Sequence, residues 1–208
     1  MGKRRFFFFC RALVLPLVFL SCADIRIPTV PDYALERKVA DEASPILRVT
    51  DDRNEAPNYR IRLSKFPRPD VLGMSVGDRS IYINYTLARL AFQNPYHRWL
   101  LRQILAHEIA HEIAGHSDGK EAPVFDRSGP HEGVTPEEIG LPAEARFQNY
   151  SMEKELEADL NGMKYWQALR WDCRIWVQIL EDFQRQNYAG DTLHPTDVRL
   201  GQALQACP

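Results

Sequence analysis

The amino-acid sequence predicts an α+β fold that is mainly helical, with a small antiparallel sheet beside one central helix. Two segments of alternating polar and apolar residues, Tyr59 to Ser64 and Ser80 to Asn84, are typical of half-buried strands. The central helix carries the pattern His107-Glu-Ile-Ala-His111, and an acidic helical segment follows further along the chain. We therefore expect the two helices to share one site.

Length and composition fit one compact domain. The chain has 208 residues, of which 45% are hydrophobic and 11% aromatic, enough to build a buried core. The formal net charge is -2, and residues 1–21 hold four basic residues and no acid, so the remainder carries -6. A mildly acidic domain without a basic cluster gives no reason to expect a nucleic-acid partner. We expect a single domain over residues 34–208.

The N-terminus has the pattern of an export signal. Lys3-Arg4-Arg5 precedes an apolar run from Phe6 to Leu20, and small residues follow this run. A basic flank and a short apolar stretch are typical of a secretory signal rather than of a membrane-spanning helix. Residues 1–21 are therefore expected to be a signal peptide.

The residues after this run favour a lipid anchor. Ser21-Cys22 resembles a bacterial lipobox, in which the cysteine is lipidated and becomes the new N-terminus, although Phe19 stands where leucine is usual. Ordinary cleavage after Ala23 is the alternative. Residues 22–33 are expected to tether the domain to the membrane. Ala23 after the cysteine, rather than aspartate, would suit outer-membrane sorting in a Gram-negative cell, so we expect a periplasmic lipoprotein anchored to the outer membrane.

Export also bears on the cysteines. We expect Cys10 to be removed with the signal peptide and Cys22 to be lipidated, which would leave Cys173 and Cys207 in an oxidising compartment. We expect them to form a disulfide that ties the C-terminal tail to a helix. Neither lies in a ligand-like spacing, so we expect no metal role for them.

Several elements are expected before the central helix. Short helices are predicted at Tyr33–Ala43 and Thr86–Phe92. The turn signal Gly77-Asp78 precedes the second predicted strand, which favours antiparallel pairing of the two strands.

The central helix is predicted from Tyr96 to Gly115, because apolar residues recur in it near helical spacing. Side chains four apart lie on one face of a helix, so His107 and His111 can hold one zinc ion with Glu108 beside them as general base. The pattern also arises by chance in charged helices, so a third ligand is needed.

The spacing after the second histidine separates the classes of zinc peptidase. A metzincin needs glycine and histidine where Ala114 and Ser117 stand, which excludes that class. A thermolysin-like enzyme would take a glutamate near His131-Glu132, but the surrounding stretch is rich in glycine and proline and is a poor rigid platform.

The acidic segment after Met152 is the better source of a third ligand. Glu155 and Asp159 are four apart and share a helical face, so one can bind metal while the other hydrogen-bonds a ligand histidine. Taken alone, such an acidic run is more often a solvated helix face.

Together these motifs resemble the CAAX prenyl protease/HtpX family of gluzincins. The resemblance runs from about Ser80 to Ala206 and rests on motifs in the same order: His107-Glu-Ile-Ala-His111, His116, Glu155-Leu-Glu-Ala-Asp159, and His194-Pro195 with Arg199. It implies a zincin-like fold and one Zn²⁺ per chain. It also implies site residues as follows: zinc ligands His107, His111 and Glu155, base Glu108, Asp159 as hydrogen-bond partner of a ligand, and His194 and Arg199 nearby.

Two stretches depart from the family pattern. Val71-Leu-Gly-Met-Ser stands where the family usually has an Asn-Ala pair before its edge strand, and Ser117 to Tyr150 reads as a loop or lid of its own kind. These departures affect the substrate cleft more than the metal site. Ser80–Asn84 is the candidate for the edge strand that binds an extended substrate, and it could equally be an ordinary strand.

The expected function is a zinc endopeptidase of the bacterial cell envelope that hydrolyses unfolded or misassembled envelope proteins. Glu108 would take a proton from water and pass it to the leaving amine. His194 is the first candidate for the oxyanion donor and Tyr150 the second; His194 could instead precede a helix at Pro195 or close the open zinc position. The alternative is a zinc-binding lipoprotein chaperone or assembly factor of the same fold, working with envelope assembly machinery and with little or no proteolysis.

Overall fold

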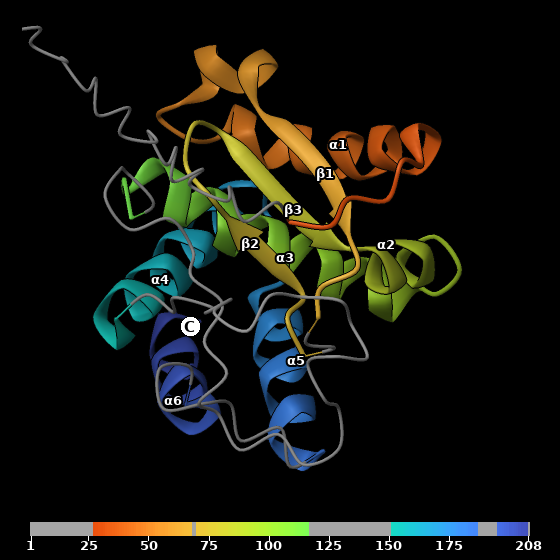
Figure 1. Cartoon of the computed structure of the whole chain (residues 1–208). Coiled ribbons are helices and arrows are strands. Elements are labelled where there is room, and N and C mark those ends of the chain that lie inside the picture. The colour runs from red at the N-terminus through yellow and green to blue at the C-terminus, as the bar shows by residue number, and fades with distance from the viewer. Residues whose placement is uncertain (1–26, 68–69, 117–150, 187–194, 208) are drawn as a thin grey trace, which may run out of the picture.

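The computed structural model describes residues 27–67, 70–116, 151–186 and 195–207. Helices predominate in these ranges, and a small sheet forms in the N-terminal half (Figure 1). In chain order the elements are α1 (Tyr33–Arg48), a 3-10 helix (Arg53–Asn58), β1 (Arg60–Ser64), β2 (Gly73–Ser75), β3 (Ser80–Asn84), α2 (Tyr85–Ala91), α3 (Pro95–Ile113), α4 (Met152–Ala168), α5 (Cys173–Arg185) and α6 (Thr196–Ala206). The α+β class is as predicted.

The sheet is mixed and has the strand order β1-β3-β2. β1 pairs with β3 in parallel, with Arg60 opposite Ser80, so the predicted antiparallel pairing of these two strands is wrong. The segment between β1 and β3 contains a third strand, β2, which pairs antiparallel with β3, with Gly73 opposite Ile83. The chain therefore reverses direction twice between β1 and β3, which makes those two strands parallel. The Gly77-Asp78 turn therefore joins β2 to β3.

This topology moves the sheet edge. Because β3 is paired on both sides, the prediction of Ser80–Asn84 as edge strand is wrong, and β2 is the edge that contacts α3. At the other edge, Val30 N–H donates to Leu63 O at 2.8 Å and Ser64 Oγ donates to Pro28 O at 2.7 Å. The last residues of the predicted tether thus lie along β1.

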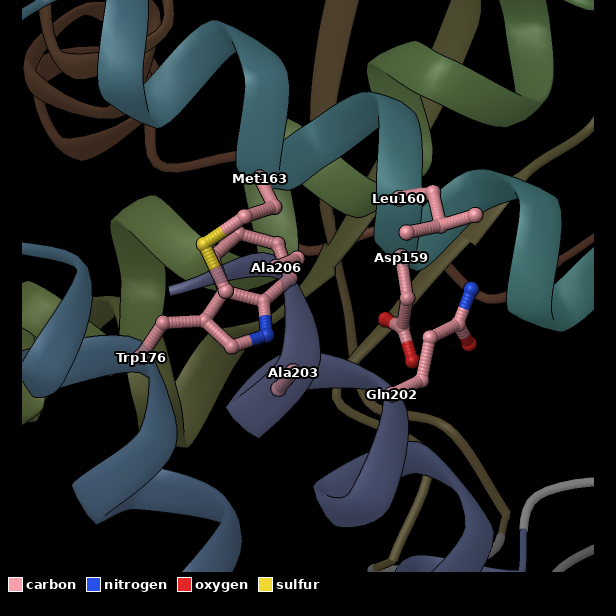
Figure 2. Close-up of a pocket in the computed structure, with 7 residues that line it drawn as sticks. All are labelled: Asp159, Leu160, Met163, Trp176, Gln202, Ala203 and Ala206. Atoms are coloured by element: carbon pink, nitrogen blue, oxygen red, sulfur yellow. The ribbon is translucent and has the colours of Figure 1, made fainter. Parts of the chain in front are cut away.

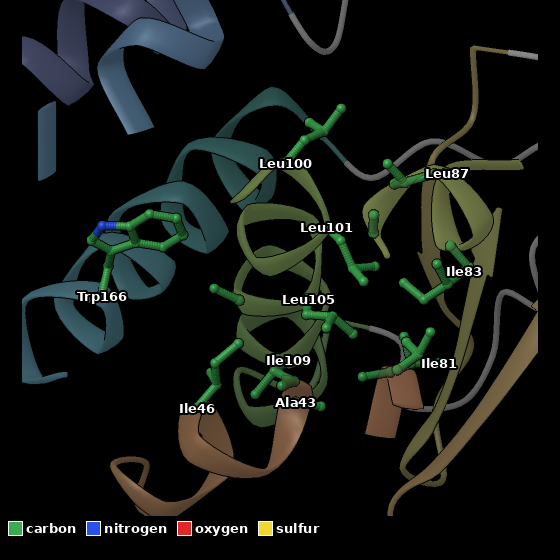
Figure 3. Close-up of a cluster of buried hydrophobic side chains, with 14 of the residues drawn as sticks. Ala43, Ile46, Ile81, Ile83, Leu87, Leu100, Leu101, Leu105, Ile109 and Trp166 are labelled. Atoms are coloured by element: carbon green, nitrogen blue, oxygen red, sulfur yellow. The ribbon is translucent and has the colours of Figure 1, made fainter. Parts of the chain in front are cut away.

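Helix α3 lies in the middle of the fold. It begins at Pro95, with the Asn94 side chain accepting a hydrogen bond from the Tyr96 N–H at 2.8 Å. Its apolar stripe is fully buried against the sheet and α1, while α4 packs on its other side (Figure 3). The stripe and the strand residues that it meets are Leu101, Leu105, Ile109, Ile81 and Ile83. Packing against these elements on two sides fixes the position of α3 in the core.

Helix α4 approaches α3 closely because Gly162 has no side chain. A Cβ built at this position would lie 2.8 Å from Trp176 Cη2 and 3.3 Å from the carbonyl carbon and oxygen of Ala106. Any larger residue would therefore push α4 away from the residue that precedes His107.

The C-terminal helices are joined by a disulfide. Cys173 at the start of α5 and Cys207 after α6 are bonded, with a Cα–Cα distance of 5.6 Å, as the sequence predicts. Gln167 of α4 also donates to Ala206 O at 2.8 Å. Over the described ranges, no helix has both the length and the apolar character that a bilayer span needs.

Candidate metal centre

Three buried side chains from two helices converge on one point. His107 and His111 are one turn apart on α3, and their Nε2 atoms lie 3.0 Å from each other. Glu155, in the first turn of α4, places Oε2 3.1 Å from Nε2 of His107 and 3.3 Å from Nε2 of His111. These three residues form a group that could hold a metal ion.

The geometry of this group fits a tetrahedral ion. Its three candidate ligand atoms form a triangle with edges of 3.0, 3.1 and 3.3 Å. With zinc–ligand bonds of about 2.1 Å, ligand atoms in a tetrahedral site lie about 3.4 Å apart. Only a small expansion of the triangle is needed, and one corner of the tetrahedron is left for a further ligand.

Asp159 contacts His107, the first candidate ligand, at the ring nitrogen that points away from the proposed ion. Its Oδ1 lies 2.9 Å from Nδ1 of His107, which keeps Nε2 of that ring directed at Glu155. Arg199 of α6 in turn donates from Nε to Oδ2 of Asp159 at 2.5 Å and from a terminal nitrogen to Oδ1 at 2.8 Å. Figure 2 shows Asp159 reaching from α4 toward α6, beside Gln202. Burial would raise the pKa of Asp159, but the charge and hydrogen bonds of Arg199 and the bond to His107 lower it well below its usual range.

His116 supports the second ligand histidine, a role that sequence reasoning missed. Its Nδ1 lies 2.8 Å from Nδ1 of His111, and its Nε2 lies 3.3 Å from Oε2 of Glu157 on α4. If Nε2 of His111 is a metal ligand, Nδ1 carries the proton and donates to His116, which can then donate to Glu157. The signal in the sequence was the histidine five positions after His111, whereas its second contact, Glu157, lies 41 positions further along the chain.

The charges at this point favour a cation. Burial opposes a charge on His107, but its hydrogen bonds to Asp159 and Glu155 and their negative charges raise its pKa to about 10. Burial and the neighbouring His107 lower the pKa of His111 to about 4, so His111 is neutral at neutral pH. The site is thus built to hold one positive charge between its carboxylates, whether a proton or a metal ion.

Glu108 follows the first histidine of this group in the sequence and contacts the edge strand β2. It is buried, and its Oε2 accepts a hydrogen bond from the Ser75 N–H at 2.8 Å. A Cβ at Gly73 would lie 2.9 Å from Cγ of Glu108 and 2.5 Å from Cγ2 of Ile104, so only glycine lets the strand come this close. The stretch that departs from the family pattern therefore supplies the edge strand.

The structure brings together His107, Glu108, His111, Glu155, Asp159 and Arg199. Several other predicted residues lie outside the described ranges: Cys22, His131, Glu132, Tyr150 and His194. The predicted roles of His194 and of the lipidated cysteine therefore stay predictions.

No family model matches the chain, and a search of curated proteins finds no match. The roles given to the site residues rest on the geometry above and on the resemblance of the sequence motifs.

Proposed function

We propose that the chain is a zinc-dependent endopeptidase. The observation that carries this proposal is the triangle of His107 Nε2, His111 Nε2 and Glu155 Oε2, with Glu108 next in sequence to the first ligand. A purely structural zinc site is closed by four protein ligands and has no use for a carboxylate base beside the metal. Two imidazoles and one carboxylate are typical of catalytic zinc.

Each residue has a definite task in this proposal. Bound zinc supplies Lewis-acid activation of water and of the peptide carbonyl. Glu108 takes a proton from the attacking water on its carboxylate and returns it to the leaving amine. Asp159 and Arg199 keep His107 oriented, while His116 does the same for His111.

The edge strand β2 fits an extended peptide. Alternate residues of an antiparallel strand direct their backbone groups outward, and the Ser75 N–H bond to Glu108 identifies the outward set as that of Gly73 and Ser75. A substrate strand that pairs with these groups would lie beside Glu108 and the ligand group. A polypeptide in unfolded form is therefore the proposed substrate class.

The proposed location is the bacterial cell envelope. The signal-like N-terminus and Cys22 support export and lipid anchoring, and the disulfide between Cys173 and Cys207 suits an oxidising compartment. Substrates would then be unfolded or misassembled envelope proteins.

The test compares wild type with Glu108→Gln after loading each with zinc. Wild type should cleave unfolded, fluorescently labelled casein, while Glu108→Gln should retain one zinc per chain and lose at least about 99% of the rate. Equal cleavage by both proteins would exclude Glu108 as the base. A wild type that binds zinc and suppresses aggregation without cutting would support the chaperone alternative, and retention of zinc by Glu155→Ala would overturn the third ligand.

A further inference from the structure

The metal helix repeats a His-Glu pair at the spacing of one turn. His107-Glu108 is followed by His111-Glu112, so the two histidines share one face and the two glutamates share the next. The histidines face Glu155, whereas both glutamates bind β2 or the turn that follows it. The second glutamate has no part in the proposed chemistry, and its contacts point to a different task.

Glu112 uses both carboxylate oxygens on the β2 hairpin. Its Oε2 accepts a hydrogen bond from Ser75 Oγ, and its Oε1 accepts one from the Arg79 N–H at 2.5 Å. Ser75 is 1% exposed, and both contacts of Glu112 are partly buried. Hydrogen bonds to a charged acceptor in such surroundings are stronger than those between neutral groups.

The turn that Glu112 holds has an unusual backbone. Gly77, Asp78 and Arg79 follow one another with φ values of 83°, 51° and 55°. This left-handed region is disfavoured for residues with a side chain, so the turn needs outside support at its last two positions. The bond from the Arg79 N–H to Glu112 gives that support, and Asp52 holds the Arg79 guanidinium at 3.3 Å.

Ser75 links the two glutamates in a way that matters for substrate binding. Its N–H, which donates to Glu108, is also the outward group that an added peptide strand would need. When a peptide carbonyl takes this N–H, Glu108 gives up one of its contacts to the strand. The contacts of Glu112 use Ser75 Oγ and Arg79 N–H instead, so they persist through this exchange.

We propose that Glu112 is a positioning residue that fixes β2 against α3, so that the Ser75 N–H can pass from Glu108 to an extended peptide substrate. The proposal rests on the proposed peptidase function for the role of the peptide. The fixing of the strand itself does not depend on that function and can be measured alone.

The first experiment measures amide hydrogen exchange in wild type, Glu112→Ala and Glu112→Gln. Loss of the carboxylate should speed exchange of the Arg79 amide at least about tenfold, with Glu112→Gln intermediate because it keeps one acceptor oxygen. Asp41→Asn, which removes an exposed carboxylate on α1, is the matched control and should leave this segment unchanged. Unchanged exchange at residues 72–80 in Glu112→Ala would overturn the proposal.

The second experiment separates substrate binding from chemistry with labelled, unfolded casein. Glu112→Ala should raise KM about tenfold or more while kcat falls less than about threefold and zinc affinity stays within about twofold of wild type. Ser75→Ala removes one partner of Glu112 but keeps the N–H, so it should raise KM less than Glu112→Ala does. The double variant should raise KM by less than the product of the two single effects.

The two readouts keep the failures apart. Loss of zinc together with activity in Glu112→Ala, or an unchanged KM despite faster exchange, would overturn the positioning role. If zinc-loaded wild type cuts no casein, the peptidase function fails. The positioning role of Glu112 is then tested by amide hydrogen exchange in the presence of a peptide hydroxamate that binds zinc. This probe should protect the Ser75 amide from exchange in wild type but not in Glu112→Ala. Equal protection in both proteins would overturn the positioning role.

Discussion

Arg199 of α6 and Asp159 of α4 form a two-pronged ion pair, with hydrogen bonds of 2.5 and 2.8 Å, directly behind the first ligand histidine. The Asp159 side chain is 6% exposed and the Arg199 side chain 14%, so neither charge is well solvated. The pair therefore contributes to the candidate metal site through the orientation of His107, as well as to the packing of α6.

The first prediction concerns this pair. Asp159→Asn should weaken zinc binding about 10- to 100-fold, because the amide is a weaker partner for the Nδ1 proton of His107. Arg199→Gln should weaken it by less, since Asp159 stays but loses its support. Competition with a zinc chelator measures both effects. Affinities equal to that of wild type would show that the pair serves α6 alone.

The second prediction concerns His116. His116→Ala should lower zinc affinity about tenfold, because Nδ1 of His111 loses its partner. Glu157→Gln should have a smaller effect, since the Glu157 side chain is 57% exposed and its contact is 3.3 Å long. The same chelator competition applies. A larger loss in Glu157→Gln than in His116→Ala would contradict the proposed order of support.

The third prediction concerns the contact between α3 and α4. Gly162→Ala should lower the free energy of unfolding by about 1–3 kcal/mol, because the new methyl group meets Trp176 and the backbone of Ala106. Gly201→Ala in α6 is the matched control: a Cβ there has nothing within 4 Å, so it should be neutral or stabilise by up to about 1 kcal/mol. Urea denaturation followed by circular dichroism compares the two. Equal stabilities would mean that α4 can shift without cost.

The fourth prediction concerns pH. Burial would raise the pKa of Glu42, but hydrogen bonds from Arg98 at 2.9 Å and Arg102 at 2.7 Å outweigh it and lower the pKa below 4.5. A carboxyl whose pKa is lowered by folding stabilises the protein above its unfolded pKa and loses that contribution as pH falls through the folded value.

Glu42→Gln should therefore cost about 1–3 kcal/mol of unfolding free energy at pH 7 and progressively less below pH 4.5. Denaturation of both proteins across this pH range measures the difference. A difference that stays constant down to pH 2 would show that the ion pair is not its source.

The sequence was sufficient to predict elements with a regular pattern of apolar residues and site residues that belong to one local motif. Helix α3, predicted from Tyr96 to Gly115, runs from Pro95 to Ile113, and β3 has the predicted bounds Ser80–Asn84. The pairing of His107 and His111 could be predicted because their i, i+4 spacing fixes their geometry within one helix.

Other features depend on contacts that no local pattern carries. Strand β2 has three residues and includes Gly73, so it shows no alternation, and without it the direction of β1 relative to β3 could not be inferred. The hydrogen bonds of Glu112 likewise join it to Ser75 and Arg79, which lie 37 and 33 positions earlier in the chain. Such pairings follow from the way the sheet lies on α3.

The disulfide makes the C-terminal part of the chain a covalent ring, with Cys173 and Cys207 34 positions apart. Closing such a ring removes about 4 kcal/mol of conformational entropy from the unfolded chain. It also tethers α6 at its second end, so Arg199 stays close to Asp159 when α6 opens. Reduction of these two half-buried cysteines should therefore slow the return of Arg199 to Asp159, and with it the support of His107, after each local opening.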